Sequence, residues 1–244
     1  MIPAWLHALA IACLLLGAIC AAIVAGDLSR HPQHMWIMNV VWPVTALFGS
    51  IWIVWQYFTY GRLATRAKMA ASMKHSEEPP NRRLTPFPII VANAALHCGS
   101  GCTLGDICAE WLAFAVPGVA VAFGWHGLFS DKIFAVWILD YIFAYGFGIV
   151  FQFFTIAPMR HLSFGKGIVA AVKADTLSLT AWQVGMYGFM AVAYFWIFQH
   201  VLGVRLTPAY AEFWLMMQIA MLAGFLTSYP VNWWLIRAGI KEKM

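Results

Sequence analysis

The sequence predicts an all-α integral membrane protein, a bundle of six transmembrane helices with both termini in the cytoplasm. Hydrophobic residues make up 62% of the 244 residues and charged residues only 10%, whereas soluble domains average about 25% charged residues. The mean hydropathy is +0.74. The 13 tryptophans and 8 tyrosines suit a chain with two membrane–water interfaces, where amphipathic rings collect. These observations favour one transmembrane domain over residues 1–244.

A transmembrane helix needs about 20 mostly apolar residues, and six segments of the chain meet this requirement. They are 3–26, 35–58, 89–123, 132–154, 175–199 and 210–235. The first segment lacks the basic start of a signal peptide and has a longer apolar run than the usual 7–15 or so residues. We therefore expect it to be retained, with cleavage near residues 21–25 as the alternative. The third segment is too long for an ordinary span, so it is expected to be strongly tilted, or broken at Gly99, Gly101 and Gly105.

The distribution of Lys and Arg predicts the orientation of the six segments. If the segments alternate in direction, twelve of the 15 basic residues fall in the linker 59–88, the connection 155–173 and the tail 236–244. The other three are Arg30, Lys132 and Arg205. Cytoplasmic loops carry the excess of basic residues, so both termini and the linker are predicted to be cytoplasmic. Because the basic residues are spread over short loops, no nucleic-acid-binding face is expected.

Three acidic residues stand out well inside the predicted spans: Asp106, Glu110 and Asp140. Ionisable groups at membrane depth cost roughly 2.5–3.5 kcal/mol each on insertion scales and are functional by default. The three acids are expected at similar depths around one cavity, with no basic residue at that depth, where a bound cation or proton would relieve their repulsion. The alternative is that each acid is protonated, or bonds to threonine and tyrosine side chains and only holds helices together.

The stretch HCGSGCTLGDICAEW (residues 97–111) carries soft metal ligands into the third span. Cys98, Cys102 and Asp106 follow one another at i, i+4 spacing, so on a helix they form one stripe. This spacing is too wide for a disulfide in a regular helix, but two such ligands can bind one metal. Thiolates select soft ions such as Cu(I) or Zn(II). His97 points about 100° away from the stripe and would join a metal site only if the backbone bends.

Helix packing is the competing interpretation of this stretch. Cysteine packs as a small hydrophobe, and Gly101 and Gly105 form a G-x-x-x-G motif, which is typical of close helix contacts. Packing alone leaves the two acids of the stretch unexplained.

A second group of soft ligands precedes the second span, where His34 and Met38 are i, i+4 neighbours. Met217 and Met221 form another such pair inside the last span. Imidazole and thioether groups at an entrance on the outer face, followed by thiols deeper in the membrane, would suit the path of a soft metal. Methionine at helical spacing is also common as core filler, and the histidine could anchor the chain at the interface.

Four stretches resemble a bacterial family of multi-spanning membrane proteins of unknown function: HMWIMNVVWPVTAL, HCGSGCTLGDICAEW, KADTLSLTAWQVGMYGFM and the last 33 residues, which begin EFWLMMQ. The resemblance covers most of the chain except the first span and the linker 59–88. It implies a multi-pass protein of the bacterial inner membrane. An association of some relatives with copper oxidases favours copper slightly. The family supplies no catalytic residues.

Three functions are compatible with these features. The first is a small transporter or permease for a soft metal cation such as Cu(I), and it is not an enzyme. The second is a membrane-embedded oxidoreductase or metal-site subunit that uses the same residues. The third is a non-catalytic scaffold or partner subunit. The expected partners are the lipid bilayer and either a second copy of the chain or another membrane subunit.

Overall fold

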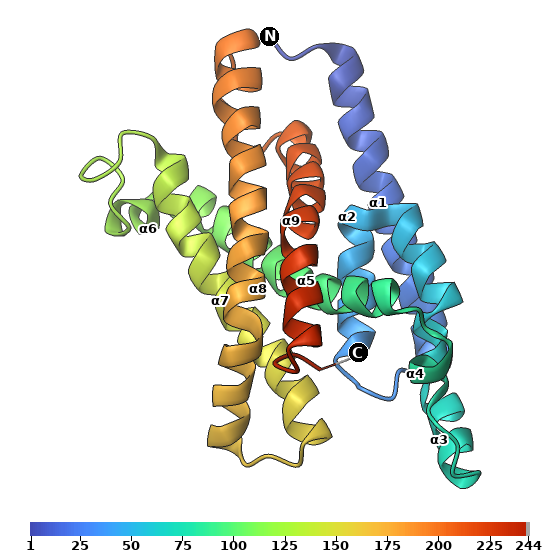
Figure 1. The fold of residues 1–244 in the computed structure, drawn as a ribbon. Helices are drawn as coiled ribbons and strands as arrows, with labels where there is room; N and C mark the ends of the chain where they lie inside the picture. Colours follow the sequence, from blue (N-terminus) through green and yellow to red (C-terminus); the bar gives the residue numbers. More distant parts are fainter. Residues whose placement is uncertain (243–244) are drawn as a thin grey trace.

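A computed structural model describes residues 1–242, and within them the fold is all-α, without a β-strand (Figure 1). Six helices are long and apolar enough to cross a membrane, which confirms the predicted class of polytopic helical bundle. They are α1 (Ala4–Arg30), α2 (Met38–Thr59), α5 (Phe87–Ala115), α7 (Lys132–Met159), α8 (Phe164–Ala191) and α9 (Ala211–Arg237). A π-helix, Val192–Val201, prolongs α8. The short helices are η1 (Gly61–Ala64), α3 (Arg66–Lys74), α4 (Pro80–Leu84) and α6 (Pro117–Ala122).

The second apolar segment is a hairpin of two half-helices, because α2 reverses direction at Ser50 (φ 44°, ψ −124°). The chain just before α2 lies beside the chain just after it. The backbone N–H of His34 donates to the Ala64 carbonyl at 2.9 Å, and that of Arg66 donates to the Pro32 carbonyl at 2.9 Å. The hairpin therefore enters and leaves the bundle on one side. This corrects the prediction that the second segment crosses the membrane.

The N-terminus and the last described residues of the tail lie on opposite sides of the bundle (Figure 1). The N-terminal ammonium donates to the Leu202 carbonyl at 2.9 Å, in the loop between α8 and α9. The tail after α9 lies beside the start of α5, where Lys241 donates to the Ala94 carbonyl at 3.3 Å. Because α2 does not cross, the N-terminus and the tail do not share one side of the bundle, which corrects the prediction that both are cytoplasmic. Which of them is cytoplasmic stays a prediction.

The hairpin also makes the distribution of basic residues between the two sides of the bundle more unequal. Arg30 ends α1 on the same side as the linker 59–88, which we call the basic face. Among the described basic residues, only Lys132 and Arg205 remain on the other side, which we call the opposite face. Lys243, counted above for the tail, lies outside the described residues. The positive-inside rule still predicts that the basic face is cytoplasmic.

The third apolar segment is one long helix followed by a short one. α5 is continuous to Ala115 and ends at Val116 (φ −127°, ψ 80°), because a residue before a proline disfavours the α conformation and Pro117 follows. The glycines that were expected to break it lie inside regular helix. Figure 1 shows that α5 crosses α8 and α9 at a large angle, as expected for a strongly tilted span. Of the six long helices, α5 is the most buried.

Two glycines of α5 allow α7 to pack at very close range. A Cβ atom on Gly101 would lie 2.9 Å from the Gly148 nitrogen, and one on Gly105 would collide with the backbone of Ala144. Small residues at a helix crossing allow such backbone approach. The predicted G-x-x-x-G packing and the polar stripe are therefore both present, on different faces of one helix.

Candidate functional site

The stripe predicted from the sequence lies in the centre of the bundle. Cys98, Cys102 and Asp106 are fully buried, and Glu110 is 6% exposed. Because α5 starts on the basic face and ends near the opposite face, Cys98 lies nearer the basic face and Glu110 nearer the opposite face. Its two halves differ in chemistry.

The half nearer the opposite face is acidic. Asp106 and Glu110 from α5 and Asp140 from α7 are all buried. Neither carboxylate oxygen of Asp106, nor Oδ1 of Asp140, has a hydrogen-bond partner among the described residues. Gln183 of α8 lies beside Asp106, but its amide group forms no hydrogen bond of good geometry either. Within the described part of the chain, Asp106 and Asp140 are thus buried without a cationic partner, whereas Lys132 lines the same cavity as Glu110.

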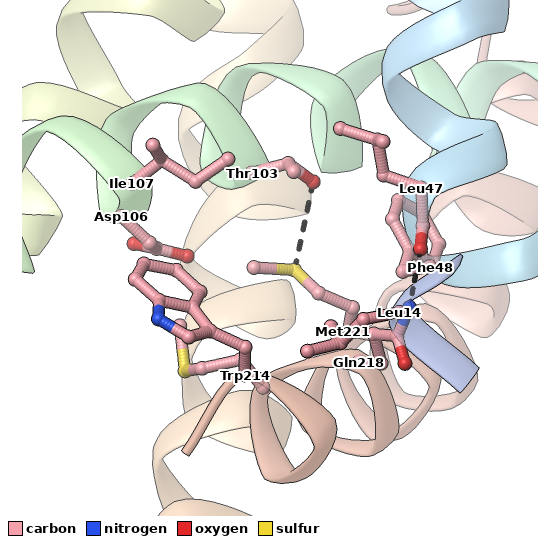
Figure 2. A pocket seen from close by; sticks show the side chains of 10 residues that line it. Leu14, Leu47, Phe48, Thr103, Asp106, Ile107, Trp214, Gln218 and Met221 are labelled. Atoms are coloured by element: carbon pink, nitrogen blue, oxygen red, sulfur yellow. Dashed lines mark hydrogen bonds between the residues drawn. The ribbon is translucent and has the colours of Figure 1, made fainter. Parts of the chain in front are cut away.

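Asp106 lines a cavity of about 160 Å³ between α5, α9 and the hairpin α2 (Figure 2). Met217 and Met221 of α9 line the same cavity. Thr103, one turn from Asp106, donates to the Gly99 carbonyl at 2.8 Å and contacts the Met221 sulfur at 3.8 Å. The cavity therefore combines a carboxylate, a hydroxyl and two thioethers.

Glu110 lines a second cavity, of about 100 Å³, which lies toward the opposite face and includes the loop before α9. Lys132 lines it as well, but its ammonium donates to the Ala113 carbonyl at 2.7 Å. No ion pair within 4 Å joins this lysine to Glu110 among the described residues. The second cavity therefore lies between Glu110 and the loop before α9, and most of its lining residues are apolar.

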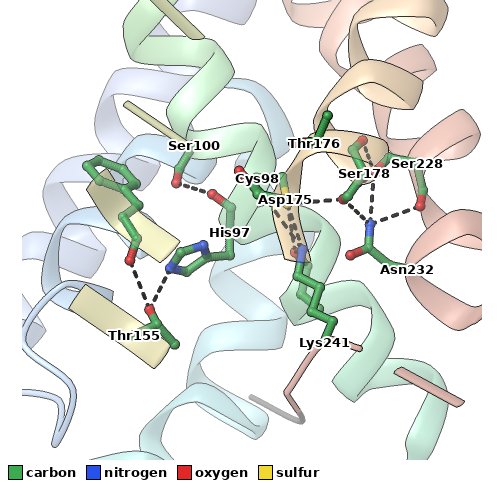
Figure 3. A network of polar contacts seen from close by, with 12 residues as sticks. His97, Cys98, Ser100, Thr155, Asp175, Thr176, Ser178, Ser228, Asn232 and Lys241 are labelled. Atoms are coloured by element: carbon green, nitrogen blue, oxygen red, sulfur yellow. Dashed lines mark hydrogen bonds and ion pairs between the residues drawn. The ribbon is translucent and has the colours of Figure 1, made fainter. Parts of the chain in front are cut away.

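The half nearer the basic face has its own cation (Figure 3). Lys241 is 2% exposed, and its ammonium donates to the Cys98 sulfur at 2.8 Å. It also pairs with Asp175 of α8 at 3.6 Å, while the Cys98 thiol donates to Asp175 Oδ1 at 2.7 Å. Burial alone lowers the pKa of Lys241, but Cys98 and Asp175 more than offset this and raise the pKa above its ordinary value. The lysine is therefore held in the charged form.

A turn after α9 delivers Lys241 to this position. Gly239 has φ 70°, a left-handed conformation that glycine adopts without strain and that commonly ends helices. The N–H groups of Ile240 and Lys241 donate to the Leu235 carbonyl at 3.0 and 3.2 Å. The chain thus reverses, and the lysine points back into the bundle.

Hydroxyl and amide groups of α8 and α9 extend this network. The Asn232 amide donates to Ser178 Oγ at 2.6 Å and to Ser228 Oγ at 2.9 Å, and Ser178 contacts the Cys98 sulfur at 3.1 Å. Sequence reasoning missed Asp175 and this hydroxyl cluster. The available signal was the i, i+3 spacing of Asp175 and Ser178, which puts two polar side chains on one face of an otherwise apolar span.

The remaining predicted ligands lie away from the stripe. His97 points toward α7, where its Nε2 is 3.0 Å from the Thr155 hydroxyl, consistent with a regular helix that does not bend toward Cys98. His34 and Met38 line a different cavity, on the basic face beside the linker and not on the outer face where they were expected, because the hairpin α2 starts and ends on the basic face. Within residues 1–242, no group of three or more His, Cys, Asp or Glu side chains is placed so that it could hold a metal ion. Metal binding by Cys98 and Cys102 remains a prediction, and in this structure the Cys98 thiol contacts Lys241 and Asp175 instead.

The fold and the site together define an integral membrane protein with a file of buried ionisable groups along its central helix. Residues 90–241 match the family described as "Domain of unknown function (DUF4396)", and the chain belongs to that family. The matched region runs from the start of α5 to Lys241 and contains the whole polar file. No curated protein and no solved structure matches the chain.

Proposed function

We propose that the protein is a small permease that moves a cation across the membrane along α5, with Asp106 at the centre of its binding site. The observation that carries the proposal is the buried, unpartnered Asp106 carboxylate lining a cavity. An unpaired charge at membrane depth is costly. A cation bound in the cavity, or transiently a proton, would supply the missing partner.

The ligand set of the central cavity favours a soft cation. Thioethers bind soft ions such as Cu(I) and contribute little to hard ions, and Met217 and Met221 both line the cavity. Cys102 lies one helical turn from Asp106 on the same buried stripe. We therefore keep Cu(I) as the proposed substrate, but centre the site on Asp106 and the two methionines, because the Cys98 thiol is already bonded to Asp175 and Lys241.

The hairpin α2 supports a transport role. Irregular backbone at membrane depth is tolerated where it is buried in protein or lines a cavity, and discontinuous helices mark the ion sites of many transporters. Leu47 and Phe48, just before the reversal at Ser50, line the central cavity. The Leu47 carbonyl accepts a hydrogen bond from Gln218 at 2.6 Å, which fixes the hairpin against α9.

The polar file suggests a direction for the path. Glu110 and its cavity would receive the ion from the opposite face, and Asp106 with Asp140 would hold it near the centre. Beyond Cys102, the contact of Lys241 with Cys98 and Asp175 closes the file toward the basic face. Passage to that side would require the tail to move, because an ammonium group and a second cation repel each other.

Uptake of Cu(I) into proteoliposomes, with Ag(I) as a second soft ion and Zn(II) as a harder one, tests the proposal. Asp106→Asn keeps the shape of the side chain and removes its charge, and we expect uptake to fall at least tenfold. Glu78→Gln, in the exposed linker, removes one carboxylate elsewhere and should leave uptake unchanged. If Asp106→Asn transports at the rate of the unsubstituted protein, or if the unsubstituted protein moves none of these ions, the acids only hold helices together.

A further inference from the structure

A cavity of about 460 Å³ opens on the basic face, away from the α5 file. Five of the 12 methionines of the chain and two of its eight histidines line it. These residues are Met35, Met38, Met69, Met73, Met159, His34 and His161. They come from three separate parts of the chain: the entry to the hairpin α2, the helix α3 and the end of α7.

Backbone contacts hold two of these parts together. Besides the His34 and Arg66 hydrogen bonds described above, the Gln33 side chain donates to the Gly61 carbonyl at 3.1 Å. The Gln33 N–H donates to the Asn39 side chain at 2.9 Å. The segment before α2 is thereby fixed beside the start of α3. Met69 and Met73 are i, i+4 neighbours on α3 and lie on the same side of that helix, so both line the cavity.

The chemistry of the lining is narrow. It offers thioether and imidazole ligands, but none of its residues is a carboxylate or a cysteine. Arg82 also lines the cavity, and its positive charge disfavours multiply charged cations most strongly. Hard ions such as Mg²⁺ need oxygen ligands, and structural Zn²⁺ sites are usually built with thiolate or several imidazoles. Neutral thioethers and imidazoles suit a monovalent soft ion, Cu(I) or Ag(I).

Two features distinguish this cavity from ordinary methionine packing. Methionine usually fills gaps in a core, whereas these side chains surround an open space. Among residues 1–242, neither imidazole of the cavity forms a side-chain hydrogen bond or an ion pair. The Asn81 side-chain oxygen, also in the lining, has no partner among the described residues. The polar groups of the cavity are thus free to bind a ligand.

We propose that this methionine–histidine cavity is a second soft-metal site, which binds one Cu(I) ion on the basic face through the thioethers of α3 and the hairpin entry together with a histidine. The site goes beyond the proposed permease and does not depend on it, since binding here requires no movement of an ion along α5. If the permease function holds as well, the cavity would accept or supply the ion at that end of the path.

Equilibrium binding of Cu(I) to the purified full-length protein, measured by competition with a coloured Cu(I) chelator, tests this proposal. Met69→Leu/Met73→Leu removes two thioethers from α3 at nearly constant volume. Met73 is 60% exposed, so folding is expected to be intact. We expect the affinity of the protein for one class of bound Cu(I) to fall by at least about tenfold. Removing a residue that only supports a metal ligand already lowers metal affinity by about tenfold or more, and these methionines would be ligands themselves.

The matched control is Met186→Leu/Met190→Leu, an i, i+4 pair buried in the bundle core that does not line this cavity. It should leave Cu(I) affinity unchanged. Asp106→Asn should also retain this class of bound ion, so failure of the permease proposal and failure of this one give different results. Unchanged Cu(I) binding in Met69→Leu/Met73→Leu, or equal losses in both methionine pairs, would overturn the proposal. Met159→Leu, on a different segment of the lining, provides a second variant for the same measurement.

Discussion

The two halves of α5 differ in whether the buried acids beside them have a cationic partner. Toward the basic face, Asp175 Oδ1 accepts from the Cys98 thiol at 2.7 Å and lies 3.6 Å from the ammonium of Lys241, although Asp175 Oδ2 has no hydrogen-bond partner among the described residues. Toward the opposite face, Asp106 and Asp140 are equally buried, yet three of their four carboxylate oxygens have no partner among the described residues. One end of the stripe on α5 therefore lies beside an acid that has a cationic partner, Asp175 of α8, whereas Asp106 and Asp140 at the other end have no such partner within residues 1–242.

This contrast separates charge used for structure from charge available for function. Breaking a buried pair by removal of one partner is strongly destabilising, because the other charge is left uncompensated. An acid that has no partner contributes nothing of this kind to stability and is a cost until something binds it. The comparison therefore supports the proposal that an ion binds near Asp106 and that the contact at Lys241 is structural or gating.

The largest effect on stability is expected at the compensated end. Lys241→Met preserves the length of the side chain but leaves Asp175 buried without its cation, and the free energy of unfolding should fall by about 3–5 kcal/mol. SDS titration of the protein in mixed detergent micelles measures this change. Adding Asp175→Asn to Lys241→Met should recover part of the loss. If the double variant is as unstable as the sum of both single variants, the two residues are not coupled and the comparison fails.

A smaller loss of stability is expected at the close contact between α5 and α7, which depends on small residues and not on charge. Gly105→Ala places a methyl group against the backbone of Ala144, and overpacking of this kind typically costs about 1–3 kcal/mol. Gly146→Ala is the matched control, because a Cβ there meets no atom within 4 Å and alanine favours the helix. Equal stability of the two alanine variants would show that the close crossing of α5 and α7 contributes nothing.

Much of the fold follows from composition, whereas the path of α2 does not. Residues 35–58 are as apolar as a membrane span. Hydropathy alone does not distinguish a helix that crosses the membrane from a hairpin that returns to the side it came from. The Gly49–Ser50 pair at its middle was the local signal, since Gly/Ser pairs are known positions of sharp kinks. The distribution of basic residues could also have shown it, because the hairpin moves Arg30 to the basic face and leaves fewer exceptions.

The candidate site was predictable in part for a similar reason. Spacing along α5 is enough to predict the stripe of Cys98, Cys102, Asp106 and Glu110, since one helix fixes their common face. The partners of that stripe lie far away in sequence: Asp175 is 77 residues from Cys98, and Lys241 is 143 residues away. A lysine in a basic tail looks like a solvated topology marker. Only the tertiary fold shows that the tail turns back into the bundle.

The most direct test of the contrast compares Asp106→Asn with Asp175→Asn by the same SDS titration. Each variant replaces one fully buried carboxylate with an amide of the same shape. We expect Asp175→Asn to lower the free energy of unfolding by about 3–5 kcal/mol, because Lys241 is left unpaired. Asp106→Asn should leave it unchanged or raise it, because no internal partner is lost. A loss in Asp106→Asn as large as that in Asp175→Asn would contradict the account, because Asp106 would then have a structural partner and not be free to bind an ion.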